Sequence, residues 1–184
     1  MADVIWTVAH DAITGAERCR LDAHGDGWQL SGVVVARHDG RVLDVHYRVG
    51  LTSDWHTRVV DVTLDRLGEP RTLRLERDAD ASWTMDGDLA PDLDGCTDVD
   101  LGITPSTNTL PIRRLGLEVG AERDIEVAWV LFPELRVERG RQTYTRLSDD
   151  VWRYSSGSFV VELTVDPDGL VVDYGNDLWR RVGA

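Results

Sequence analysis

An alternation of apolar and polar residues with a period of two runs through most of this chain. Leu43, Val45 and Tyr47, for example, occupy every second position of one run. Successive side chains of a β-strand point to opposite faces of the sheet, so this period predicts strands with one buried face. The runs are Trp28–Val35, Arg41–Val49, His56–Leu64, Thr72–Glu76 and Ser158–Val165.

Short clusters of turn-forming residues separate these runs. Gly, Asp and Pro favour tight turns, which join antiparallel neighbours. Only Asn176–Val182 is expected to form a short helix. We therefore predict an all-β fold with little helix, in which a large antiparallel meander curls into an open barrel or roll as a single domain over residues 1–184. The turn clusters are Gly25-Asp26-Gly27, Asp39-Gly40, Gly68-Glu69-Pro70, Asp86-Gly87-Asp88 and Pro167-Asp168-Gly169.

The segment Ile125–Phe132 differs from the other runs because it is apolar on both sides. Val127 and Trp129 belong to one face, while Ala128 and Val130 belong to the other. A strand that is apolar on both faces is covered on both faces. The sheet is therefore expected to fold back on itself, or to be crossed by another segment, at this point. A curled sheet with an apolar interior is the arrangement that a lipid cavity requires.

The stretch 94–119 combines two predicted strands with an ordered polar loop. In Thr97–Ile103, Asp98 and Asp100 share one face, opposite three apolar residues. Pro111 cannot donate to a β-ladder, so the second strand is expected to span Ile112–Val119. In that strand Arg113 shares a face with leucines, which predicts a buried guanidinium. Asp98 or Asp100 is the expected ion-pair partner.

The charge of the chain excludes some classes of function. It carries 33 acidic residues against 20 arginines and no lysine, for a net charge of −13. An acidic chain of this kind is not expected to bind nucleic acid or to dock on anionic membranes through a polybasic patch. The lack of lysine also excludes Schiff-base chemistry, which needs a lysine amine.

The N-terminus and the cysteines predict a cytoplasmic protein. Asp3 stands where a signal peptide would be basic, and no long apolar h-region follows it. No uncharged apolar run approaches the roughly 18 residues of a membrane-spanning helix. Cys19 and Cys96 are too few for a disulfide framework, so they are expected to be buried, reduced thiols.

No motif of a cofactor, metal or catalytic site is present. The sequence lacks a nucleophile elbow, a P-loop, a dinucleotide-binding glycine motif and a CxxC pair, and its five histidines show no ligand spacing. We therefore expect no cofactor and no metal. Seven tryptophans are unusual beside two phenylalanines. They can fill a core or stack on sugar faces, and Trp6 and Trp55 are the two we single out as ligand-binding candidates.

Asp98 and Asp100 allow two interpretations. Paired carboxylates flank the substrate in glycosidases, so a glycoside or ester hydrolase is one possibility. The other is an ion-pair lattice with Arg113 and Arg114, which would lower both carboxyl pKa values and keep both groups ionised near pH 7. We favour the ion-pair lattice.

Several polar residues lie in or beside the predicted strands. Such groups could contact a ligand headgroup, or they could satisfy the backbone of neighbouring loops. The sequence leaves both roles open. These residues are Thr107, Asn108, Gln142, Tyr144 and Tyr154.

Residues 95–115, GCTDVDLGITPSTNTLPIRRL, resemble the signature of the putative glycolipid-binding family of bacterial proteins. The resemblance implies an open β-structure with an apolar cavity, similar to envelope lipoprotein and lipid carriers. It also implies a glycolipid as the ligand. Further matching pieces follow in the same order along nearly the whole chain: Tyr47-Arg48-Val49, Asp54-Trp55, Gln142-Thr143-Tyr144-Thr145-Arg146, Gly169-Leu170-Val171 and Asp173-Tyr174.

We therefore expect a non-catalytic protein that binds an amphiphile, a glycolipid or another fatty-acyl lipid, in an apolar cavity. A hydrolase using Asp98 and Asp100, or a structural protein whose core is filled, are the alternatives. The oligomeric state is left open. The candidate ligand-binding residues are Trp6, Tyr47, Trp55, Asp98, Asp100, Thr107, Asn108, Arg113, Arg114, Gln142 and Tyr144.

Overall fold

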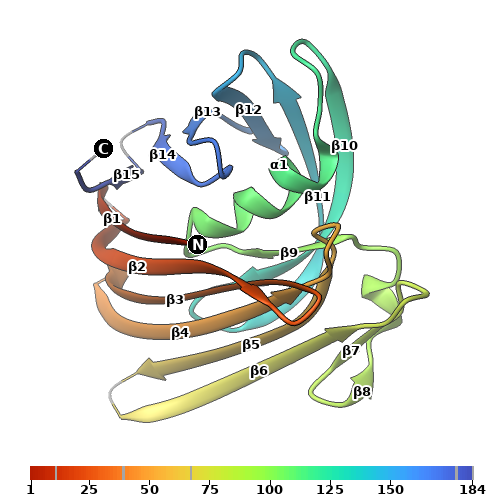
Figure 1. Cartoon of the computed structure of the whole chain (residues 1–184). Coiled ribbons are helices and arrows are strands. Elements are labelled where there is room, and N and C mark those ends of the chain that lie inside the picture. Colours follow the sequence, from red (N-terminus) through yellow and green to blue (C-terminus); the bar gives the residue numbers. More distant parts are fainter. Residues whose placement is uncertain (11, 39, 67, 177, 184) are drawn as a thin grey trace.

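The computed structural model describes residues 1–10, 12–38, 40–66, 68–176 and 178–183, and it consists of one curled sheet of 15 strands around a short helix (Figure 1). The predicted all-β fold is confirmed. The strands are β1 Ala2–His10, β2 Ile13–His24, β3 Gly27–His38, β4 Arg41–Leu51, β5 Thr57–Arg66, β6 Glu69–Arg77, β7 Trp83–Met85, β8 Asp88–Leu89, β9 Asp98–Leu101, β10 Glu122–Leu131, β11 Arg136–Arg146, β12 Val151–Ser156, β13 Phe159–Val165, β14 Val171–Tyr174 and β15 Trp179–Arg181. The helices are α1 Thr109–Leu115 and two 3-10 turns, Pro91–Leu93 and Ser106–Asn108.

The sheet is a meander in which sequence neighbours are also neighbours in space. Its order runs from β8 back to β1, then through β15 to β14 and on to β9. The pairing of β1 with β15 joins the two halves of the sheet and places both ends of the chain on the same side (Figure 1). Only β9 and β10 pair in parallel among the described strands, and β8 and β9 form the edges. The sheet is therefore curled but not closed.

The edge strand β9 folds back onto the opposite half of the sheet. The backbone N–H of Val99 in β9 donates to Thr57 Oγ1 at the start of β5, over 3.0 Å. On the neighbouring strand β10, Val127, Ala128 and Val130 are all buried, although they alternate between the two faces. The prediction that this segment is covered on both sides is confirmed, because residues of both faces of β10 are buried.

Helix α1 replaces the strand predicted over Ile112–Val119, and that prediction was wrong. Pro111 lies in the first helical turn, where the missing N–H costs no hydrogen bond. Gly116 ends the helix with a positive φ of 52°, a conformation that glycine adopts without strain. The two arginines of the last turn interact favourably with the helix dipole. The helix lies inside the curl of the sheet (Figure 1).

The short helix predicted over Asn176–Val182 is also wrong. Residues Trp179–Arg181 form strand β15, which pairs with β1 on one side and β14 on the other. Residue 177 lies outside the described residues. Tertiary pairing with β1 explains the difference, since only a strand can connect the two halves of the sheet.

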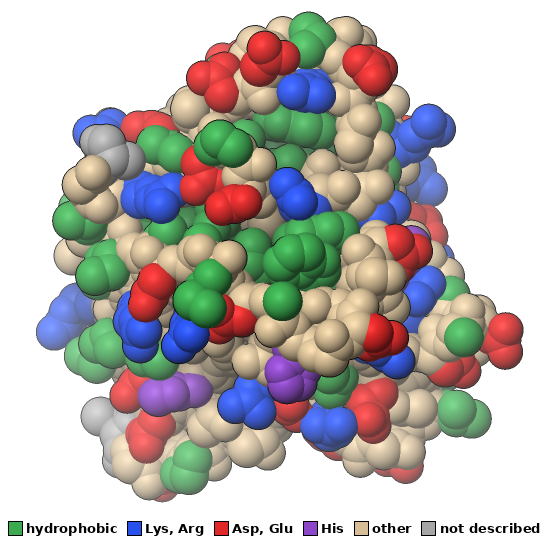
Figure 2. All heavy atoms as spheres, in the orientation of Figure 1, with side chains coloured by type: hydrophobic (Ala, Val, Ile, Leu, Met, Phe, Trp, Pro, Cys, Tyr) green, Lys and Arg blue, Asp and Glu red, His purple; other side chains and the backbone are tan. Residues whose placement is uncertain are grey.

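The buried and exposed faces of the sheet follow the alternation of the sequence. In β4, for example, Leu43, Val45 and Val49 are fully buried on the concave side. Figure 2 shows one face of the molecule, on which acidic and arginine side chains are interspersed around hydrophobic side chains near the middle. Within the part of the chain that the structure describes, no helix combines the length and apolar character needed to cross a membrane.

Candidate functional site

A cavity of about 330 Å³ lies between the C-terminal strands and the segment that follows β9. This volume is within the range of known ligand sites, about 300–1,000 Å³. Its walls come from β2, β3, β9, β10 and β12–β15. Residues 102–108 between β9 and α1, called the motif loop below, and the turn before β15 complete them. The described lining residues are Ile13, His38, Asp100, Gly102, Ile103, Thr104, Asn108, Trp129, Tyr154, Ser156, Phe159, Tyr174, Leu178 and Trp179.

Aromatic side chains form much of the cavity wall. Tyr154 contacts Phe159 edge-on with ring centroids 6.1 Å apart, and Phe159 contacts Tyr174 at 6.5 Å. Trp129 and Trp179 add two indoles from β10 and β15. Phe159, the first residue of β13, is 39% exposed to solvent. The wall thus offers large apolar surfaces with a few polar atoms, as expected of a site for an amphiphile.

Asp100 is the acidic group of this cavity. Its Oδ2 accepts a hydrogen bond from Gln142 Nε2 at 2.6 Å, and its Oδ1 accepts one from Thr107 Oγ1 at 3.3 Å. Burial among protein atoms raises the pKa of Asp100 to about 6, and the two hydrogen bonds oppose this rise only in part. The predicted lowering of this pKa by nearby arginines is wrong, because both carboxylate oxygens are bound by neutral side chains.

Asn108 and Tyr144 connect the motif loop to β11. The hydroxyl of Tyr144 donates to Asn108 Oδ1 at 2.9 Å, while Asn108 Nδ2 donates to the carbonyl of Pro105 at 3.1 Å. Asn108 lines the cavity, and Tyr144, which does not line it, holds Asn108 through this hydrogen bond. The structure therefore brings Asp100, Thr107, Asn108, Gln142 and Tyr144 together at the polar end of the cavity.

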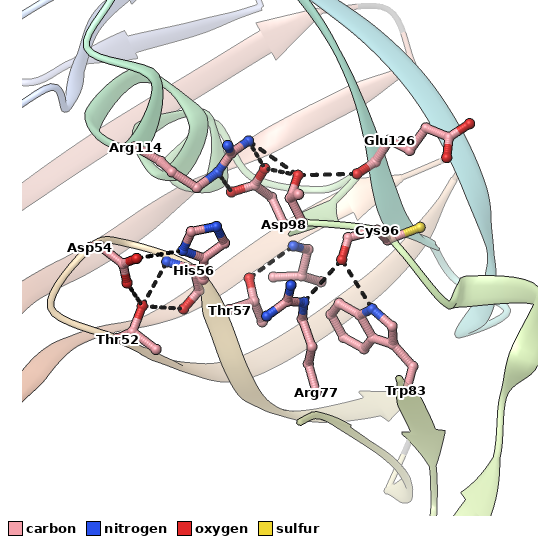
Figure 3. A network of polar contacts seen from close by, with 12 residues as sticks. Thr52, Asp54, His56, Thr57, Arg77, Trp83, Cys96, Asp98, Arg114 and Glu126 are labelled. Carbon is pink, nitrogen blue, oxygen red and sulfur yellow. Dashed lines mark hydrogen bonds and ion pairs between the residues drawn. The ribbon is translucent and has the colours of Figure 1, made fainter. Parts of the chain in front are cut away.

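Asp98 lies two residues before Asp100 in β9 but has a different environment. Arg114 of α1 holds it with two bonds, Nε to Oδ1 at 3.1 Å and Nη2 to Oδ2 at 2.6 Å (Figure 3). The side chain of Asp98 is 1% exposed and that of Arg114 is 12% exposed. Arg114 also donates to Thr97 Oγ1. This buried, two-bonded pair fixes α1 to β9, and neither residue lines the cavity.

Arg113 does not form the predicted buried ion pair. It is exposed, its guanidinium carbon lies 4.9 Å from the centre of the Trp55 ring, and its Nη1 donates to the carbonyl of Pro167 at 3.3 Å. The prediction failed because consecutive residues of a helix point in directions about 100° apart. The helix therefore turns Arg114, and not Arg113, towards Asp98.

The remaining candidates lie outside the cavity. Trp6 is fully buried, and its Nε1 donates to the carbonyl of Val171 at 2.7 Å, which ties β1 to β14. Trp55 stacks on Trp28 with ring centroids 5.0 Å apart. Tyr47 contributes to a separate buried cluster on the concave side of β2–β4. For these three aromatic residues the structure shows packing roles.

The Tyr47 cluster contains a second buried carboxyl group. The hydroxyl of Tyr47 donates to Glu17 and lies 2.8 Å from Ser106 Oγ. Burial raises the pKa of Glu17 to about 7. No described residue supplies a partner for Glu17 Oε2. The sequence contained a signal for this group, because Glu17 falls on the same side of its alternating run as Cys19 and Leu21.

Sequence reasoning missed the aromatic wall. None of its five residues is among the ligand-binding residues predicted from the sequence, although Tyr154 is one of the polar residues whose role the sequence leaves open. Their alternation is the same as that of ordinary core residues, so the pattern alone does not separate a cavity wall from a filled core. The position of Trp129 in the two-faced strand was the one usable signal. The missed residues are Trp129, Tyr154, Phe159, Tyr174 and Trp179.

A larger depression of about 530 Å³ lies on the outer face of β2–β5. Several of its charged residues belong to ion pairs on this face, such as Arg18 with Asp3 and Arg20 with Asp22. Such pairs are typical of a solvated sheet face. Among the described residues, no group of three or more His, Cys, Asp or Glu side chains is arranged to hold a metal ion.

Comparison with known proteins places this architecture in a family. The sequence model of the putative glycolipid-binding family matches residues 3–181. The crystal structure of a DUF1089 family protein from Pseudomonas aeruginosa is similar over 93% of both chains, with a TM-score of 0.78 and 32% identity.

A second solved structure shares the fold alone. It is a beta-barrel-like protein of the domain of unknown function DUF1849 from Brucella abortus, with a TM-score of 0.55, 13% identity and coverage of 97% of this chain and 93% of that one. No curated protein matches the chain. Because the family model spans nearly the whole sequence, and the motif in residues 95–115 builds the loop and helix beside the cavity, the chain belongs to the putative glycolipid-binding family.

Proposed function

We propose that this protein binds an amphiphilic ligand, a glycolipid or another lipid, in the aromatic cavity and does not act on it chemically. The observation that carries the proposal is the cavity itself. Five aromatic side chains, together with apolar residues and a smaller polar end around Asp100 and Asn108, surround about 330 Å³ inside a curled sheet. The name of the family and the barrel-like relatives agree with ligand binding.

The size of the cavity limits what it holds. A water molecule occupies about 30 Å³ of liquid volume, so the cavity has room for about ten groups of that size. A headgroup or a short part of an acyl chain fits inside, while the rest of a lipid leaves through the mouth near Phe159. Each buried methylene contributes about 0.8 kcal/mol, against an association cost of roughly 4–15 kcal/mol. Moderate affinity is the expected result.

The arrangement of carboxyl groups favours binding over hydrolysis. A glycosidase needs two carboxyl groups that both reach the substrate. Here Asp100 lines the cavity, but Asp98 is occupied by Arg114. A filled-core structural role is less well supported, because the cavity is not filled by its own tryptophans.

The test is native mass spectrometry of the purified protein, combined with organic extraction and identification of any lipid. We expect a lipid adduct in the wild type. Ser156→Phe, which places a ring in the cavity, should abolish the adduct. Ser155→Phe is the matched control, since Ser155 is the neighbouring residue on the opposite face of β12 and does not line the cavity.

Two results would reject the proposal. One is a wild-type protein that binds no lipid, either co-purified or added as a panel of glycolipids and phospholipids. The other is an adduct that survives equally in both serine variants. Hydrolysis of glycosides or esters by the wild type, lost in Asp100→Asn while the fold is retained, would replace binding by catalysis.

A further inference from the structure

The polar end of the cavity carries the carboxyl group of Asp100, which has no counter-charge in an ion pair among the described residues. Asp100 is bound by two neutral side chains. Arg114 is occupied by Asp98. The described lining contains one histidine and no arginine, and the chain has no lysine. With a pKa of about 6, the carboxyl group is mostly ionised at pH 7. An anionic headgroup would be repelled from this site.

The polar atoms beside Asp100 already have partners within the protein. Asn108 uses one of its two side-chain N–H groups and its carbonyl oxygen within the protein. Thr104 donates to Ser106 Oγ at 2.8 Å, and Ser156 Oγ donates to the carbonyl of Arg141 at 3.4 Å. A neutral polyhydroxylated ring needs several free donors and acceptors. The polar side chains next to Asp100 are therefore already engaged within the protein, and Asp100 is the one acidic residue of the described lining.

The rest of the wall consists of aromatic faces. Aromatic rings attract cations through their electron-rich faces, and cages of such rings recognise alkylated ammonium groups. Two of these rings are close enough to feel the charge of Asp100. Burial is the main cause that raises the pKa values of Tyr154 and Tyr174, and the charge of Asp100 raises both further. A cation in the cavity would interact with the ring faces and the carboxylate together.

We propose that the cavity binds a positively charged amino or alkylammonium group of its ligand, held by the carboxylate of Asp100 and the aromatic faces of Trp129, Tyr154, Phe159, Tyr174 and Trp179. This inference rests on the proposed function, since it names the headgroup of the amphiphile. The charged group belongs either to an amino sugar or to a simple alkylammonium headgroup.

Calorimetric titrations at pH 7, where Asp100 is mostly ionised and the probe amines remain mostly protonated, test the charge with two pairs of probes. The first pair is choline and 3,3-dimethylbutan-1-ol, which have the same shape but differ in charge. The second pair is a decyl 2-amino-2-deoxyglucoside and the corresponding decyl glucoside, both below their micelle concentrations. We expect the cationic member of at least one pair to bind tenfold or more tightly. The pair that shows the preference identifies the source of the amine.

Two variants connect the preference to the cavity. Asp100→Asn preserves shape and should reduce the preference to less than threefold. Phe159→Leu removes one exposed ring face and should weaken the cationic probes more than the neutral ones. It provides the test if Asp100→Asn does not fold. Val160→Leu, at the neighbouring position outside the cavity lining, is the control and should change nothing.

The outcomes separate this inference from the proposed function. Equal affinity within both pairs, or a preference that persists in Asp100→Asn, overturns the inference. In either case, binding of a decyl glycoside would still support a lipid-binding role. A preference for choline, without added affinity from any decyl chain, supports the cation site and contradicts the lipid role.

Discussion

Two aspartates two residues apart show how strongly the local environment decides the role of a side chain. Asp98 and Asp100 point to the same side of β9, as their spacing predicts. Asp98 meets a guanidinium from α1, whereas Asp100 meets an amide and a hydroxyl. One carboxylate therefore serves as a structural anchor, and the other is the charged group of the cavity.

The Arg114–Asp98 pair should be a major source of stability. Arg114→Ala leaves the carboxylate of Asp98 buried without a counter-charge, and breaking a buried pair in this way costs about 3–5 kcal/mol. The neighbouring Arg113→Ala loses an exposed contact with Trp55, worth about 0.5–1 kcal/mol, and an exposed hydrogen bond to the carbonyl of Pro167, so its loss should be smaller. Urea denaturation of the two variants measures the difference. Equal losses would contradict the helical geometry of this segment.

Glu17 should make stability depend on pH. Its pKa of about 7 in the folded protein lies above the ordinary value of 4.5, so the folded state binds the proton more tightly than the unfolded state. The resulting stabilisation is complete below about pH 4.5 and is lost as the pH rises through 7, by a few kcal/mol. Asp100, with a folded pKa of about 6, adds a loss in the same direction.

The free energy of unfolding, measured between pH 5 and pH 8.5, checks this dependence. It should fall across the range in the wild type and fall less in Glu17→Gln, which keeps the size of the side chain but has no charge to bury. Glu122→Gln, at an exposed site, is the control. A wild-type protein that becomes more stable with rising pH would contradict the burial of a carboxyl group without a counter-charge at position 17.

At the scale of single elements, the strands were predictable and the helix was not. Period-two alternation identifies a strand wherever one face of the sheet is buried, which holds for most of this chain. The residues of α1 fit the same pattern by coincidence, since Arg113 and Leu115 are also two apart. Pro111, the arginine pair and Gly116 are the usual start and stop signals of a helix, and giving them more weight would have found it.

The contact between β9 and β5 is the element-level test of the folded-back sheet. Thr57 is fully buried, and its hydroxyl accepts the hydrogen bond of the Val99 N–H (Figure 3). Thr57→Val removes the acceptor without changing the shape of the side chain, so one buried N–H loses its partner at a cost of about 1–3 kcal/mol.

Thr63→Val is the matched control for this test, because Thr63 is exposed on the same strand. Its free energy of unfolding should stay close to that of the wild type. If Thr57→Val is as stable as Thr63→Val, β9 does not rest on β5 in the way described here.

For the whole molecule, the sequence predicted the curled meander and its apolar interior but not the location of the open space. The two halves of the sheet are joined through β1 and β15. The location of the cavity depends on which aromatic side chains of β10 and β12–β15 then pack against each other and which leave space between them. These contacts link residues far apart in the sequence. Local patterns therefore identified Asp100 and Asn108, which lie in the motif, and missed Trp129 and Trp179.

Photo-crosslinking tests the central claim most directly, namely that an amphiphile occupies this cavity. The protein is irradiated with an alkyl amphiphile that carries a diazirine near its headgroup, and the modified residues are located by peptide mass spectrometry. We expect labels on β10 near Trp129, on β12 and β13 near Tyr154 and Phe159, and near Trp179, all competed by unlabelled amphiphile. Labels confined to the outer face of β2–β5, or labels that excess amphiphile does not displace, would contradict the account.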